Sequence, residues 1–129
     1  MDTKRVAKYT KWTDIYNTQY RVALNNLKVA LETATKDSII NCIHNVYNSG
    51  IHTLLIYLRN NGFFKHDNLS VIKESIYIDF IEDGEDWIKI YEILENSNNT
   101  TFDFGFINKC VNAFIKLDEK FLGAIENDC

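Results

Sequence analysis

Apolar residues near the start of the chain recur at three- and four-residue steps, the spacing of one face of a helix. This spacing predicts an amphipathic helix from about Lys11 to Ala34, with an apolar stripe formed by Trp12, Tyr16, Tyr20, Ala23, Leu27, Ala30 and Leu31. A second line of Ile15, Val22 and Val29 repeats every seven residues, about a quarter-turn away. Two interpretations stay open. The helix has one wide core face, or it buries one face in its own bundle and another against a partner subunit.

A second amphipathic helix follows, and its ends are marked. Asp37 or Ser38 can cap its start, and Gly62 can end it. Gly50 in its middle costs about 1 kcal/mol relative to alanine, so we expect it to permit close approach of another helix. The apolar stripe comprises Ile40, Ile43, Tyr47, Gly50, Ile51, Leu54 and Leu58, and the opposite side carries Asn41, Asn45, Asn48 and His52, with His44 beside Asn48.

The rest of the chain continues this pattern, and no segment alternates with period two. After a loop, "GFFKHDN", we expect a short helix from Ser70, with Glu74 near a capping position, and a turn, "FIEDGEDW". A helix through Trp87 to about Asn96 follows, then one from about Asp103 to Glu126, with an apolar face of Ile107, Cys110, Val111, Phe114, Leu117, Phe121 and Ile125. The pattern predicts an all-α fold: an antiparallel up-and-down bundle of four long helices plus one short helix. We expect the bundle to be a single domain over residues 1–129, with residues 1–10 as a loose N-terminal segment.

Composition narrows the class of protein. The 129 residues are 46% hydrophobic and 25% charged, with a net charge of −4, as in ordinary globular proteins. We therefore do not expect a nucleic-acid partner, and the apolar runs are too short to span a membrane. The start lacks the apolar region of a secretory signal. Cys42, Cys110 and Cys129 form no zinc pattern; we expect the first two to be small buried hydrophobes in a cytoplasmic protein.

Catalytic and metal-binding patterns are not apparent, so the residues alone assign neither a catalytic residue nor a metal ligand. The sequence has no Gly-rich phosphate loop, HExxH motif or nucleophile elbow. His44 and His52 lie about 12 Å apart along a helix, too far to share a metal by themselves. The acidic "EDGED" run imitates a cation site, but helix capping and solvation explain it more simply. The loop Asn96–Thr101, "NSNNTT", can hold an anion beside a helix N-terminus, although most such loops are only turns.

Two longer segments carry a family resemblance. "SIINCIHNVYNSGIHTLLIYLRNNG" and "SVIKESIYIDFIEDGEDWIKIYEILENSNNTTFDF" resemble the nucleotidyltransferase substrate-binding proteins, a branch of the HEPN superfamily. The resemblance extends from Tyr16 onward. The residues that match the family pattern are Tyr47, Thr53, Leu54, Tyr57, Leu58, Gly62, Val71, Ile72, Glu74, the "IEDGEDW" segment, Leu94, Glu95, Asn98 and Thr100.

The resemblance implies a helical bundle that pairs as a homodimer and acts beside a separate minimal nucleotidyltransferase. In one proposal for the family, the helical protein supplies the substrate site and its partner the catalytic site. In the toxin–antitoxin branch, the helical protein is an RNase toxin restrained by the nucleotidyltransferase. The RNase signature is an arginine, four to six residues, then a histidine, at the loop that contains "NSNNTT".

This chain departs from the RNase signature at its chemical positions. Ser97 occupies the arginine position and Phe102 the histidine position, so one lacks a guanidinium and the other cannot transfer a proton. Phe104 stands where some toxins carry a tyrosine that the partner modifies with AMP. Cys42, His44 and Asn48 also replace charged family residues. We therefore expect the ribonuclease chemistry to be lost and a neutral polar cleft to remain, comprising His44, Asn48, Asn96, Ser97, Asn98 and Thr100.

Three functional hypotheses follow. The first is a noncatalytic substrate-binding partner of a minimal nucleotidyltransferase, with no cofactor of its own and a nucleotide reaching it only through the partner. The second is a dimeric helical scaffold without a ligand. The third is a divergent RNase toxin in which His44 replaces the lost acid or base. A homodimer through Ile15, Val22 and Val29 is a further hypothesis, motivated by the second apolar line of the first helix and by the family resemblance.

Overall fold

The computed structural model describes residues 10–64, 66–96 and 103–127, and within these ranges it contains helices and turns but no strand. The predicted loose segment 1–10 falls almost entirely outside them. The elements are α2 (Trp12–Ile15), the π-helix η1 (Tyr16–Tyr20), α3 (Arg21–Thr33), α4 (Lys36–Asn60), α5 (Asn68–Tyr77), α6 (Gly84–Asn96) and α7 (Phe104–Asn127). The predicted all-α class is confirmed.

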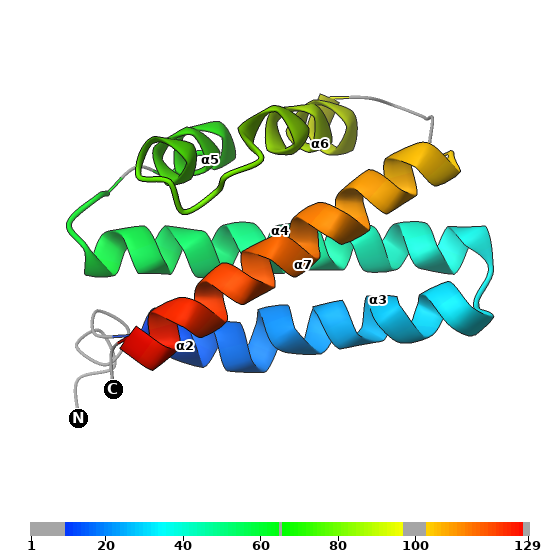
Figure 1. Ribbon diagram of the computed structural model, residues 1–129, viewed down its shortest axis with the longest axis horizontal. Coiled ribbons are helices and arrows are strands. Elements are labelled where there is room, and N and C mark those ends of the chain that lie inside the picture. Colours follow the sequence, from blue (N-terminus) through cyan, green and yellow to red (C-terminus); the bar gives the residue numbers. More distant parts are fainter. Residues whose placement is uncertain (1–9, 65, 97–102, 128–129) are drawn as a thin grey trace.

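The helices form an antiparallel bundle around α4. The continuous run from α2 to α3 and the returning α4 make one hairpin, and α5 and α6 lie on the other side of α4 (Figure 1). The last helix, α7, crosses diagonally over these layers and packs against α3, α4 and α6. The arrangement agrees with the predicted four long helices plus one short helix, when α2, η1 and α3 count as one.

The first helix has the predicted extent but not a uniform winding. Tyr16–Tyr20 forms a π-helical turn inside an otherwise α-helical run. The tyrosines at its two ends are buried, and both donate to α7: Tyr16 Oη to Asp118 Oδ1 at 2.5 Å, and Tyr20 Oη to the Phe114 carbonyl at 2.6 Å. These two bonds fasten the first helix to the last.

Two predicted helix caps were wrong by a few residues. The cap of α4 is Thr35, whose Oγ1 accepts the Ser38 N–H at 3.3 Å, not Asp37 or Ser38. The cap of α5 is Asp67, which accepts the Ser70 N–H at 3.0 Å, so the helix begins at Asn68 rather than Ser70. In contrast, Asp103 accepts the Phe106 N–H at 2.8 Å, and Gly62 ends α4 with a φ of +93°.

The predicted apolar stripes contribute to one continuous core, and Phe121 lies in an aromatic cluster within it. The Phe121 ring centroid lies 5.4–5.6 Å from those of four other aromatic side chains: Trp12, Tyr16, Tyr20 and Phe80. Leu31 was assigned to the stripe of the first helix, yet 38% of it is exposed, whereas Leu24 is buried in its place. This difference places the core face of α3 slightly to one side of the predicted stripe.

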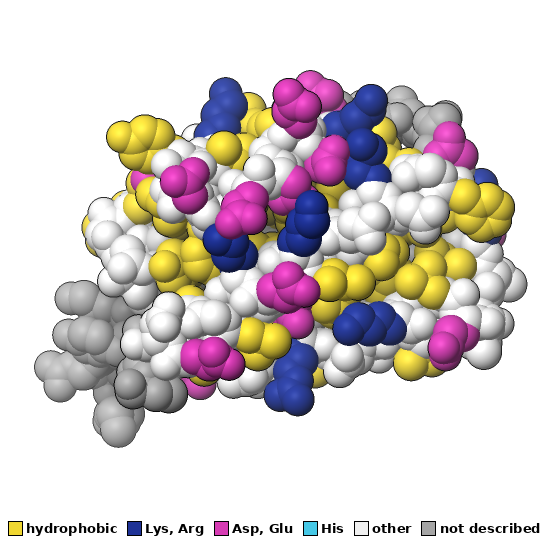
Figure 2. Space-filling view, in the orientation of Figure 1, with side chains coloured by type: hydrophobic (Ala, Val, Ile, Leu, Met, Phe, Trp, Pro, Cys, Tyr) yellow, Lys and Arg dark blue, Asp and Glu magenta, His cyan; other side chains and the backbone are white. Residues whose placement is uncertain are grey.

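The surface carries charges of both signs. On the face in Figure 2, basic and acidic side chains are interspersed among hydrophobic and neutral groups rather than gathered into fields of one sign. Within the described part of the chain, no helix combines the length and the hydrophobicity needed to cross a membrane.

Candidate functional site

Three helices meet at Glu95, in the last turn of α6. Its Oε2 accepts a hydrogen bond from the Tyr47 hydroxyl of α4 and a second, at 2.8 Å, from the Asn68 side-chain amide of α5. Tyr47 also stacks on Trp87 of α6, with ring centroids 6.3 Å apart. This Glu95 junction fixes the end of α6 against α4 and α5, immediately before residues 97–102.

The junction keeps Tyr47 in its neutral, donating form. Burial of the phenol raises its pKa well above the ordinary value, and the hydrogen bond to Glu95 and the charge of that carboxylate raise the pKa further. An ionised phenolate beside a carboxylate would be repelled. A neutral phenol instead donates to it.

The predicted cleft residues fall into two groups. His44 and Asn48 flank Tyr47 on α4: His44 lies about one turn before it, whereas Asn48 is the next residue and lies about 100° further round the helix. His44 is half-buried and Asn48 is exposed. Asn96 is the last residue of α6. Ser97, Asn98, Thr100 and Phe102 lie outside the described residues, so the predicted cleft as a whole stays a prediction.

Phe104, the third altered motif position, is the first residue of α7. Its side chain is 80% exposed. A phenylalanine has no hydroxyl that could accept a nucleotidyl group. Phe104 therefore offers only an exposed apolar ring.

The candidate dimer residues lie on the outer side of the first helix. Ile15 is half-buried, whereas Val22 is 49% and Val29 61% exposed. The interpretation as one wide core face is therefore wrong for the two valines. A recess of about 250 Å³ runs beside Val22, lined also by Gln19, Ala23, Asn26, Cys42 and Asn45. Cys42 is only half-buried, against expectation, whereas Cys110 is buried as predicted.

The acidic "EDGED" run forms two ion pairs with α7. Glu82 pairs with Lys120 at 2.7 Å, and Asp86 pairs with Lys109 at 3.0 Å. In the described ranges, no group of three or more histidine, cysteine or acidic side chains is arranged to hold a metal ion. Ion pairs with α7 thus account for two of the run's carboxylates. Exposed pairs of this kind contribute little to stability.

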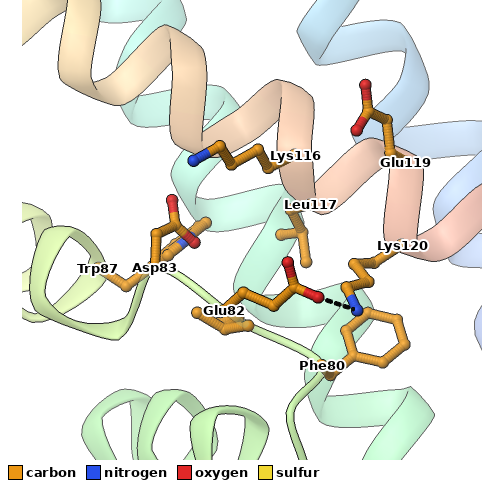
Figure 3. Close-up of a pocket in the computed structure, with 9 residues that line it drawn as sticks. Phe80, Glu82, Asp83, Trp87, Lys116, Leu117, Glu119 and Lys120 are labelled. Atoms are coloured by element: carbon orange, nitrogen blue, oxygen red, sulfur yellow. Dashed lines mark ion pairs between the residues drawn. The ribbon is translucent and has the colours of Figure 1, made fainter.

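Sequence reasoning missed a pocket between residues 80–87 and α7, which we call the α7 pocket. Its volume is about 240 Å³, and its lining comprises Phe80, Ile81, Glu82, Asp83, Trp87, Lys116, Leu117, Glu119 and Lys120 (Figure 3). Asp83 is half-buried, and that burial raises the pKa of its carboxyl. The "IEDGEDW" segment of this turn matches the pattern of the resembling family, but that match did not indicate a cavity.

Comparison with known proteins adds no family or function to the fold described above. No known protein family, no curated protein and no solved structure matches the chain. What is established is a small all-helical domain with the contacts of a bundle.

Proposed function

We propose that this protein is a noncatalytic, substrate-binding partner of a minimal nucleotidyltransferase. The Glu95 junction is the observation that carries the proposal. It holds α4, which carries His44 about one turn before Tyr47, against the end of α6, where the resembling family has its functional loop.

The residues behind the resemblance have structural roles in this chain. Gly62 ends α4, and Glu95 joins three helices. Most of the matching apolar residues are buried in the core, including Tyr47, Leu54, Leu58, Val71, Ile72 and Trp87. A resemblance that rests on core and cap residues supports a shared fold, and the proposed function takes this shared fold as its starting point.

The absence of catalysis is proposed from side-chain chemistry. A serine at position 97 cannot neutralise a phosphate as a guanidinium does, and a phenylalanine at position 102 cannot move a proton. Amide, hydroxyl and imidazole groups can still hydrogen-bond a ligand without transforming it. The chemistry would then belong to the nucleotidyltransferase, which would also bring the nucleotide.

A dimeric scaffold is the second candidate, favoured by the exposed valines of α3. Two β-branched apolar side chains, Val22 and Val29, lie two turns apart on the same side of one helix. Pairing of that side with a second copy would remove both from water. A homodimer is compatible with either function, so only binding of a nucleotidyltransferase or a ligand separates them.

The experiment is affinity capture of the tagged full chain from a lysate of the cells that make it, with bound proteins identified by mass spectrometry. We expect a small nucleotidyltransferase at near-stoichiometric yield. His44→Ala and Asn48→Ala should reduce this yield, because the proposed complex uses these two polar side chains of α4. Asn112→Ala is the matched control, because Asn112 is an exposed asparagine on α7, away from the junction.

A further inference from the structure

We propose that the α7 pocket binds a small zwitterion of about the size of a free amino acid. Trp87 lines this pocket and also stacks on Tyr47 of the Glu95 junction, but the polar groups of the two sites differ. The inference does not depend on the nucleotidyltransferase proposal. The pocket is formed by the "IEDGEDW" segment, which the proposed function leaves without a role.

The volume of the pocket limits the ligand. The volume is about 240 Å³. Pockets that enclose drug-sized ligands are larger, at about 300–1,000 Å³. The α7 pocket is therefore of a size that suits a small ligand such as a free amino acid.

The charges of the lining favour a ligand that carries both signs. Glu82 and Lys120 neutralise each other at 2.7 Å. Lys116 of α7 and Asp83, the residue before α6, then present opposite charges at the same edge of the pocket, whereas the Glu119 carboxylate points away from them (Figure 3). A purely anionic ligand would be repelled by Asp83, and a purely cationic one by Lys116. A zwitterion can place its carboxylate on Lys116 and its ammonium group on Asp83.

The inner wall of the pocket suits an apolar side chain. Phe80, Ile81 and Leu117 are all buried core residues that reach this wall. Contact with them would remove the ligand's own apolar surface from water. This combination of an apolar wall and a few polar groups is typical of small-molecule sites.

Trp87 gives an independent indication that a polar ligand belongs here. Its side chain is fully buried, and its indole Nε1–H has no acceptor among the described residues. A buried donor without an acceptor is costly, so a ligand carboxylate in this wall would satisfy it. Because the indole is covered, the carboxylate reaches it only when a lining side chain moves. The Trp87 indole N–H should therefore report binding.

The test is an NMR titration of the full chain that follows its indole N–H signals. The chain has two tryptophans, Trp12 and Trp87, and only Trp87 lines the pocket. The free amino acids are added one at a time at millimolar concentration. For each amino acid that binds, its N-acetyl derivative and its amide are titrated next, because each derivative lacks one of the two charges.

We expect a saturable shift of the Trp87 signal with at least one free amino acid, and a much weaker shift with both derivatives. Lys116→Met and Asp83→Asn should each weaken binding about tenfold or more, the loss of one charge-assisted hydrogen bond. Lys109→Met removes a cation from the same helix outside the pocket and should leave binding unchanged. The proposal is overturned if no amino acid shifts the Trp87 signal, or if either derivative binds as tightly as the free amino acid. It is also overturned if both pocket variants bind as tightly as wild type.

Discussion

Gly50 of α4 lies directly against the ring of Tyr20: a β-carbon at Gly50 would come within 3.0 Å of Tyr20 Cε1. Tyr20 cannot easily yield, because it is fully buried and its hydroxyl donates to the Phe114 carbonyl. The expectation that Gly50 permits close helix approach is thus confirmed. The glycine lets α4 and the π-helical turn pack against each other.

Replacing Gly50 with alanine should destabilise the protein by about 1–3 kcal/mol, the cost of overpacking a core. Alanine is the better helix former, so helix propensity alone predicts the opposite sign. Gly123→Ala is the matched control: it lies in α7, and its β-carbon would meet nothing within 4 Å. That variant should gain up to about 1 kcal/mol. Urea unfolding of both variants measures the difference, and equal effects would contradict the packing explanation.

Removing the Tyr47 hydroxyl should weaken the Glu95 junction. In Tyr47→Phe, the Glu95 carboxylate keeps Asn68 but loses its phenolic donor. We expect a loss of about 1.5–3 kcal/mol in the free energy of unfolding, as for a hydrogen bond to a charged group. Tyr77→Phe changes an exposed tyrosine of α5 in the same way and should cost almost nothing. A Tyr47→Phe variant as stable as that control would mean that the junction does not hold the helices together.

Three tyrosines should make the fold sensitive to alkali. Burial raises the pKa values of Tyr16, Tyr20 and Tyr47, and the nearby carboxylate of Asp118 or Glu95 raises them further. Above about pH 10, these phenols ionise in the unfolded chain but stay protonated in the folded one. The unfolded state then binds fewer protons, so stability falls as pH rises. Denaturant unfolding below and above that pH, for wild type and the three Tyr→Phe variants, measures the slope. The variants should show a shallower decline.

The exposed valines of α3 predict self-association. Val22→Asp places a charge in the proposed dimer face and should shift a dimer toward monomer in sedimentation. Leu122→Asp makes the same kind of change at a half-exposed leucine of α7 and should leave the assembly intact. An unchanged profile for Val22→Asp, or equal dissociation of both variants, would exclude this face as the interface.

Periodicity was sufficient to predict the helices, because the burial of one face leaves its spacing in the sequence. Trp12, Tyr16 and Tyr20 illustrate this, as they lie in the core where their spacing places them. Periodicity did not fix the caps. Thr35 lies close to Asp37 and Ser38, and all three residue types cap well, so backbone geometry makes the choice.

Relationships between distant residues were beyond this kind of inference. The Tyr47–Glu95 bond joins residues 48 positions apart, and the α7 pocket depends on how α7 crosses the turn before α6. The sequence did not indicate the π-helical turn either, because Tyr16 and Tyr20 have the four-residue spacing of an ordinary α-helix. Such features follow from the packing of whole helices rather than from any single segment.

The most direct test of the proposed function is the mass of the native assembly recovered when the tagged full chain is captured from cells that make it. Native mass spectrometry gives both its composition and its stoichiometry. Binding of a small nucleotidyltransferase in a fixed ratio, reduced by Asn48→Ala but not by Asn112→Ala, is the result that we predict. Recovery of the chain alone, as a monomer or a dimer, would contradict the proposal and favour a scaffold.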